Sequence, residues 1–178
     1  EADVKLTPAG KDGTYRFYYW NRQGRSDEVS AANPTDAKLS RAGNQGVGIS
    51  FDQSISSLLG VWMRAGAQRE KVAQFGRFLG GGLNFSGPFV SRPNDNAGFG
   101  YGADFIGKDY KAFKTNSSSA FKPAAEHYIE AYYNIAIDGA KDSTGLHVTP
   151  DVQYVINPGG DREQNKLFIY GVRLQAYF

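Results

Sequence analysis

The sequence predicts an all-β fold, a transmembrane antiparallel up-and-down β-barrel with about nine strands. Among its 178 residues are 22 glycines, 12 phenylalanines and 11 tyrosines but a single methionine, a composition typical of strands rather than helices. Apolar residues alternate with polar ones and never form the run of about 20 that a membrane helix needs. Because only alternate residues of a barrel strand face lipid, this pattern is typical of a membrane barrel.

Nine segments show the period of two that indicates strands. The clearest is the last, in which the apolar Tyr170, Val172 and Leu174 alternate with Arg173 and Gln175. In chain order the nine segments are 2–6, 15–20, 47–52, 61–65, 79–85, 97–105, 126–137, 146–156 and 168–178.

One side of these strands is expected to point outward, away from the interior of the barrel. The residues that define this side are Phe51, Tyr101, Phe105, Tyr133, Ile135, Val152, Tyr154, Val172 and Leu174. Arginine that faces lipid at the bilayer midplane costs about 2–4 kcal/mol. We therefore expect Arg16, Arg64 and Arg173 on the opposite side, together with Asp104, Glu130 and Asp151.

The connections between the strands alternate in length. Short ones at 8–13, 55–57, 87–95 and 138–145 alternate with longer or more polar ones at 24–45, 67–75, 108–125 and 157–166. Outer-membrane barrels have short turns at one end and long loops at the other. We therefore expect 25–44 and 108–125 at one end and 9–13 and 138–144 at the other. No segment is predicted to be a helix, apart from a single turn that 69–78 could form, and no linker divides residues 1–178.

Several classes of protein are excluded or disfavoured. Cysteine is absent and the two histidines lie twenty positions apart, so we expect no disulfide, no metal centre and no cofactor. A net charge of +2 gives no basis for binding nucleic acid. Glu126 and Glu130 would lie about 13 Å apart on a strand, farther than the roughly 5–9.5 Å between paired glycosidase carboxylates. With no nucleophile or phosphate-binding motif either, we expect no catalytic residue and no enzyme.

The end of the chain and several internal motifs resemble a known family. The aromatic strand that ends at Phe178 resembles the signal that the bacterial barrel-assembly machinery recognises. The sequences GLNFSGP at 82–88, RPNDN at 92–96 and VTPDVQYVINPGG at 148–160 resemble the carbohydrate-selective porins of OprB type. The resemblance implies an outer-membrane location, sixteen strands, a chain about twice this length and a homotrimer. Residues 1–178 would then be the carboxy-terminal portion of one porin barrel domain.

This resemblance implies passive diffusion of small sugars through a water-filled barrel in contact with outer-membrane lipid. Charges of both signs interleaved with aromatic side chains suit neutral sugars, whose hydroxyls form hydrogen bonds and whose C–H faces stack on rings. The side chains expected to line the interior and contact sugar are Arg16, Trp20, Asp52, Trp62, Arg64, Asp104, Glu130, Asp151 and Arg173.

Other interpretations remain open on sequence alone. The arginines could pair with neighbouring carboxylates and stiffen the wall, the two tryptophans could belong to an interfacial girdle, and His147 is expected to be a hydrogen-bonded wall residue. The chain could form a general diffusion porin without sugar preference. It could also be a soluble all-β carbohydrate-binding module, which would need no detergent.

Overall fold

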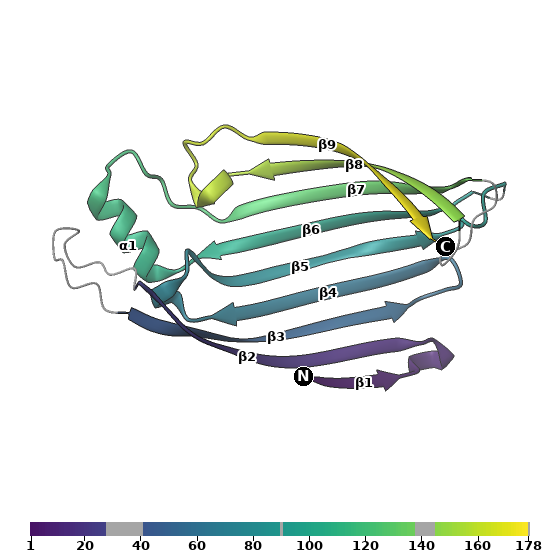
Figure 1. The fold of residues 1–178 in the computed structure, drawn as a ribbon, viewed down its shortest axis with the longest axis horizontal. Helices are drawn as coiled ribbons and strands as arrows, with labels where there is room; N and C mark the ends of the chain where they lie inside the picture. The colour runs from purple at the N-terminus through teal and green to yellow at the C-terminus, as the bar shows by residue number, and fades with distance from the viewer. Residues whose placement is uncertain (28–40, 90, 138–144, 178) are drawn as a thin grey trace.

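A computed structural model describes residues 1–27, 41–89, 91–137 and 145–177. Nine strands form one sheet in which each strand lies antiparallel to its neighbours in the sequence (Figure 1). The strands are β1 (Ala2–Leu6), β2 (Gly13–Asp27), β3 (Arg41–Ser54), β4 (Leu59–Gln68), β5 (Phe75–Ser86), β6 (Asn96–Ile106), β7 (Glu126–Ala136), β8 (Gly145–Ile156) and β9 (Leu167–Tyr177). The predicted all-β, up-and-down order and the number of strands are confirmed.

The pairing register keeps two faces of the sheet separate. Phe51 pairs with Tyr15 and Met63, whereas the adjacent Asp52 pairs with Trp62. We call the face that carries Phe51 the apolar face and the face that carries Trp62 the polar face. All nine side chains predicted to point outward share the apolar face. Because side chains alternate with a period of two, a pairing shifted by one residue would have moved all the side chains of that strand to the other face.

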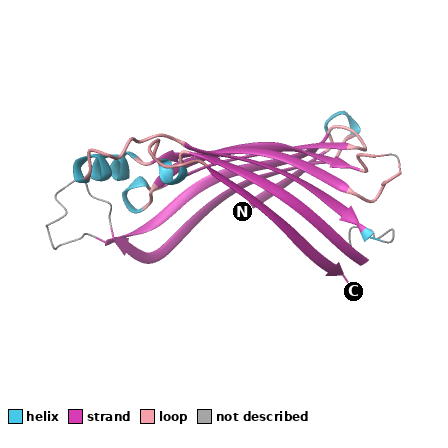
Figure 2. Cartoon of the chain, turned by 90° about the horizontal axis from the view of Figure 1, so that it is seen from above, coloured by secondary structure: helices cyan, strands magenta, loops and turns pink. Residues whose placement is uncertain are grey.

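The sheet has no hydrophobic core of the kind that a soluble domain buries. Figure 2 shows the strands as one curved layer. Among the described residues, the buried apolar side chains are those of Ala103 and Ala136, while the apolar face carries residues as exposed as Tyr170 at 80%. A soluble sandwich buries one face of each sheet against a second layer. The described residues therefore do not form the soluble module that the sequence left open.

Successive connections lie at alternate ends of the sheet, and the longest described one, 107–125, lies at the loop end. The loop end carries 69–74, 107–125 and 157–166, and the turn end carries 7–12, 55–58 and 87–95. The predicted separation of 108–125 from 9–13 is confirmed. Residues 28–40, 138–144 and Phe178 lie outside the described residues, so the predictions for those loops and for the terminal phenylalanine are untested there.

A helix at the loop end was not predicted. Helix α1 (Lys108–Ser117) lies beside the short 3₁₀ helix η2 (Glu70–Val72), which is the single turn expected within 69–78. The Tyr110 ring meets the Phe121 ring edge-on at 6.4 Å, and Lys114 Nζ lies 5.7 Å from the Tyr110 ring. Within α1 the aromatic residues are Tyr110 and Phe113, and two such residues are too few to give a helical period in a ten-residue segment. Packing on the loop therefore stabilises a helix that the sequence pattern does not indicate. No helix among the described residues has the length and apolar character to cross a membrane.

Strands β2 and β3 extend farther than predicted. The alternation of apolar residues covers 15–20 and 47–52, but backbone pairing continues to Asp27 and Arg41 through a register shift between Arg22 and Ser26. The added residues are mostly polar, so backbone hydrogen bonds rather than an apolar face hold them. The sequence expectation of a loop over 24–45 is therefore wrong at both of its ends.

The turn between β5 and β6 is fastened to β7 by one buried carboxylate. Asp95 is 3% exposed and accepts hydrogen bonds from Ala136 N at 2.9 Å and Tyr133 Oη at 2.7 Å. Arg92 donates to both of its oxygens, at 2.8 and 3.0 Å, and to Ala136 O at 3.0 Å. Burial alone would raise the pKa of Asp95, but these donors stabilise the ionised form and hold its pKa below the usual value. We call Asp95 with these partners the Asp95 clamp.

Candidate functional site

Aromatic rings of the polar face lie against glycines of neighbouring strands. In five cases the glycine is the direct register partner of the ring, and a Cβ atom there would overlap it. The ring and glycine pairs are Tyr18 with Gly48, Trp20 with Gly46, Trp62 with Gly82, Tyr128 with Gly102 and Tyr132 with Gly98. Glycine is used here because its lack of a side chain lets a large ring lie flat on the sheet.

Three of these rings, those of Trp62, Tyr128 and Tyr132, lie around a small groove over the middle of the sheet. The residues that line it on the polar face are Trp62, Phe78, Gly100, Tyr128, Glu130 and Tyr132, and its volume is ≈ 130 Å³. We call it the glycine-floored groove. Asp52, Trp62, Gly82, Gly100 and Glu130 are successive register partners on β3 to β7. The backbones of Trp62 and Glu130 are therefore three strand spacings apart, about 14 Å at ~4.8 Å each, and only glycines lie between them.

The charged groups beside the groove have opposite signs. The guanidinium of Arg64 lies over the Trp62 ring, with Cζ 5.2 Å from the ring centroid, a geometry typical of a cation–π interaction. Glu130 lies at the other side of the groove and pairs in register with Gly100 and Gln153. A solute in the groove would thus meet an aromatic face, hydrogen-bond donors on one side and an acceptor on the other.

The groove includes residues that were not among the predicted site residues. Asn84 Nδ2 donates to Tyr132 Oη at 2.9 Å, across the strand that carries Gly98, which fixes the position of the Tyr132 ring. The Phe78 ring stacks on Tyr128 with 6.3 Å between centroids. The sequence signal for these residues is the alternation of glycines at 98, 100 and 102 and of aromatic residues at 128 and 132. Only the β6–β7 register shows which glycine faces which ring.

The other predicted site residues are spread over the polar face. Arg16 forms an ion pair with Asp52, and its Nε lies 4.0 Å from Asp3. The side chains of Arg16 and Asp52 are 33% and 44% exposed, so water screens the pair and it contributes little to stability. This pairing agrees with the alternative that an arginine stiffens the wall. Trp20 lies on Gly46 near the loop end, on the polar face and therefore away from any lipid-facing girdle.

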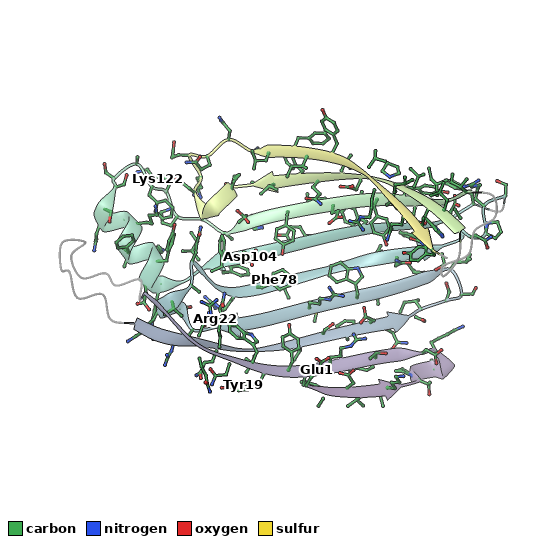
Figure 3. All side chains as sticks on the ribbon, in the orientation of Figure 1. Glu1, Tyr19, Arg22, Phe78, Asp104 and Lys122 are labelled. Atoms are coloured by element: carbon green, nitrogen blue, oxygen red, sulfur yellow. The ribbon has the colours of Figure 1, made fainter. Side chains whose placement is uncertain are left out.

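Three predicted residues lie to one side of the groove or beyond it. Asp104 pairs in register with Phe78 and Glu126, and Figure 3 shows Asp104 and Phe78 side by side. Asp151 pairs with Tyr132, and Arg173 pairs with Thr149. The prediction that Arg16, Arg64 and Arg173 share a face with Asp104, Glu130 and Asp151 is confirmed by the register. Contact with sugar remains a prediction for all nine residues.

His147 is a hydrogen-bonded wall residue, as predicted. It is 3% exposed, its Nδ1 lies 2.9 Å from Asn134 Oδ1, and its ring meets Tyr177 edge-on at 5.6 Å. In the described part of the chain, no group of three His, Cys, Asp or Glu side chains is arranged to hold a metal ion.

Comparison with known proteins gives three findings. The model of the carbohydrate-selective porin, OprB family, matches residues 5–178. Porin B of Pseudomonas aeruginosa is 26% identical over an alignment of 109 residues that covers 54% of this chain and 23% of Porin B. The high-pH structure of OprB from Pseudomonas putida superposes with a TM-score of 0.82 at 21% identity, covering 98% of this chain and 46% of that one.

This chain thus spans less than half the length of both proteins. The family match covers nearly all of it, and the solved structure has the same fold. The family and the bacterial outer-membrane location that the sequence predicted are confirmed. The chain belongs to the carbohydrate-selective porin family of OprB type.

Proposed function

We propose that this chain forms part of the wall of a water-filled barrel through which sugars diffuse passively across the outer membrane. The observation that supports this most is the glycine-floored groove. Its rings can take the C–H face of a sugar, while Arg64 and Glu130 can donate to and accept from hydroxyls. Such contacts are individually weak, and weak contacts let a solute leave as well as enter. Nothing in this process requires a catalytic residue, so we propose a channel and not an enzyme.

The barrel itself needs more strands than the described sheet contains. Among the described residues β1 pairs with β2 and β9 pairs with β8, but the edge strands β1 and β9 do not pair with each other. An open sheet edge in hydrocarbon leaves backbone groups without hydrogen bonds. We therefore propose that residues 1–178 are one portion of a single larger porin barrel, in which further strands pair with both edges and the polar face surrounds the channel.

The proposed partners follow from the two faces. Small sugars are the transported solutes on the polar face, and outer-membrane lipid covers the apolar face. The exposed apolar residues of β9, such as Val172 at 73% and Leu174 at 68%, support recognition of this strand by the barrel-assembly machinery. A homotrimer is proposed on the family resemblance, and no nucleic acid partner is proposed.

Replacing Trp62 with alanine in the complete porin is expected to lower the preference for sugar over an uncharged solute of similar size by about two- to twelvefold. This loss corresponds to one aromatic contact worth roughly 0.5–1.5 kcal/mol. The measurement is the rate of liposome swelling in a monosaccharide relative to a small polyethylene glycol, at low solute concentration.

The matched control is Phe85→Leu, which changes an aromatic residue of the apolar face on the strand that carries Gly82, outside the groove. This variant should keep the ratio of the unmodified protein. An unchanged ratio in Trp62→Ala, with normal swelling in both solutes, would favour a general diffusion porin without sugar preference.

A further inference from the structure

The apolar face has a hollow over strands β2 to β6. Ala65 and Ala67 form its floor, and larger side chains stand on both sides, Phe17 and Tyr19 from β2 and Leu79 and Phe105 from β5 and β6. Its volume is ≈ 860 Å³. We call it the apolar hollow.

The hollow follows from the cross-strand register. One row of partners runs Tyr19, Val47, Ala67, Arg77 and Phe105. The next row places Ala65 between larger residues in the same way. Small residues at two successive positions of β4, between large ones on both sides, leave a channel along the strand. The hollow covers strands β2 to β6 and up to three positions of each, and because barrel strands are tilted by about 35–45°, an acyl chain along the bilayer normal would cross it obliquely.

Arg77 is the unusual residue of this surface. Among the described, register-paired side chains of the apolar face, it alone is Lys, Arg, Asp or Glu. Its Cζ lies 6.0 Å from the Phe105 ring, and no described acidic side chain pairs with it. It is the third residue of β5 and follows η2 closely, at the loop end. A cation on the lipid-facing side is tolerated near the interface and disfavoured at the midplane.

A tyrosine of β2 lies in the same register row as Arg77. The row runs from Tyr19 through Val47 and Ala67 to Arg77, and Tyr19 Oη donates to Gln45 Oε1 at 3.3 Å. A tyrosine with an apolar body and a polar tip is typical of the boundary between hydrocarbon and headgroups. Together with the position of Arg77 close to the loop end of β5, this favours headgroup depth for the guanidinium, with the apolar hollow extending from it toward the middle of the strands.

We propose that the apolar hollow seats one acyl chain of a lipid whose anionic phosphate headgroup binds Arg77. This inference rests on the proposed barrel, in which the apolar face contacts lipid. An anionic lipid supplies both an apolar chain for the hollow and a negative group for the unpaired guanidinium. A second copy presenting this face would bring another Arg77, and the carboxylate that lines the hollow among the described residues, that of Glu1, lies at its β1 side, so a second copy fits less well.

The test is native mass spectrometry of the complete porin in neutral detergent, with phosphatidylglycerol or phosphatidylcholine of equal chain length. One phosphatidylglycerol should be retained per chain, and Arg77→Gln should weaken its binding about tenfold, as expected for one charge-assisted contact. Lys71→Gln, which removes an exposed cation of η2, should leave retention unchanged. Ala67→Phe, which fills the hollow, should weaken both lipids.

Equal retention of phosphatidylglycerol by the unmodified porin and Arg77→Gln would overturn the proposal. So would a lower oligomeric state of Ala67→Phe, because the hollow would then be a contact between subunits. Sugar flux through the same preparations reports separately on the channel. Lipid retention without sugar flux would count against the proposed function and leave the lipid site in place.

Discussion

Replacing Asp95 with alanine in the complete porin is expected to lower the free energy of unfolding by about 2–3 kcal/mol. The change leaves Ala136 N without its acceptor at the buried end of β7 and removes the acceptor of Tyr133 Oη. Arg92 is 41% exposed, so water can solvate its guanidinium and the loss stays below that of a fully buried ion pair. Urea unfolding in detergent, followed by the heat-dependent gel shift typical of barrels, measures the difference.

The control for this variant is Asp12→Ala, which removes an exposed acid from another connection at the same end. It should change stability by less than about 0.5 kcal/mol.

The stability difference between the unmodified porin and Asp95→Ala should depend on pH. Because its pKa is held below the ordinary 3.8, the carboxylate of Asp95 contributes fully above that pH and loses its contribution as pH falls through the lower folded value. A difference between the unmodified porin and Asp95→Ala that grows on acidification would contradict the Asp95 clamp.

Replacing Gly82 with alanine should destabilise the barrel by about 1–3 kcal/mol, the usual cost of overpacking. Glycine to alanine within a strand is ordinarily favourable. Here the new Cβ would overlap the carbonyl oxygen of Phe99 and lie 2.8 Å from the Trp62 ring. Relief of the overlap requires β6 to move away from β5, which weakens the pairing of the two strands, and the Trp62 ring to shift as well. Unfolding in urea gives the stability, and sugar flux should fall as well.

The matched substitution is Gly60→Ala on β4, where the nearest atom to a new Cβ is Gln53 O at 3.8 Å. That distance is an ordinary contact, so this variant should be neutral or slightly more stable. Equal effects of the two substitutions would show that the glycines serve strand curvature alone and that the ring contact is incidental.

The strands and their faces were predictable because the side-chain period of a strand is two. A single polar position, such as Arg64 or Asp104, fixes the face of its whole strand, and apolar neighbours on each side confirm it. The alternation also indicates which residues of each strand face lipid. It gives no information on polar extensions, which is why β2 and β3 are longer than expected.

The site was predictable only in part. The sequence places Trp62, Arg64 and Glu130 on one face, but their proximity depends on the registers of three strand pairs. The roles of Tyr128 and Tyr132 follow from which glycine each ring covers, and a sequence pattern contains no such cross-strand information. The Asp95 clamp joins residues 41 positions apart, beyond the reach of any local motif.

The most direct test of sugar permeation is the ionic current through single channels of the complete porin in a planar bilayer, as neutral sugar is added. We expect the current to fall in a saturable way, because a sugar that pauses in the glycine-floored groove displaces the ions of the channel, and Trp62→Ala should raise the half-saturating concentration. A current that falls only in proportion to the viscosity of the solution, equally for sugar and for polyethylene glycol, would contradict a sugar-selective channel.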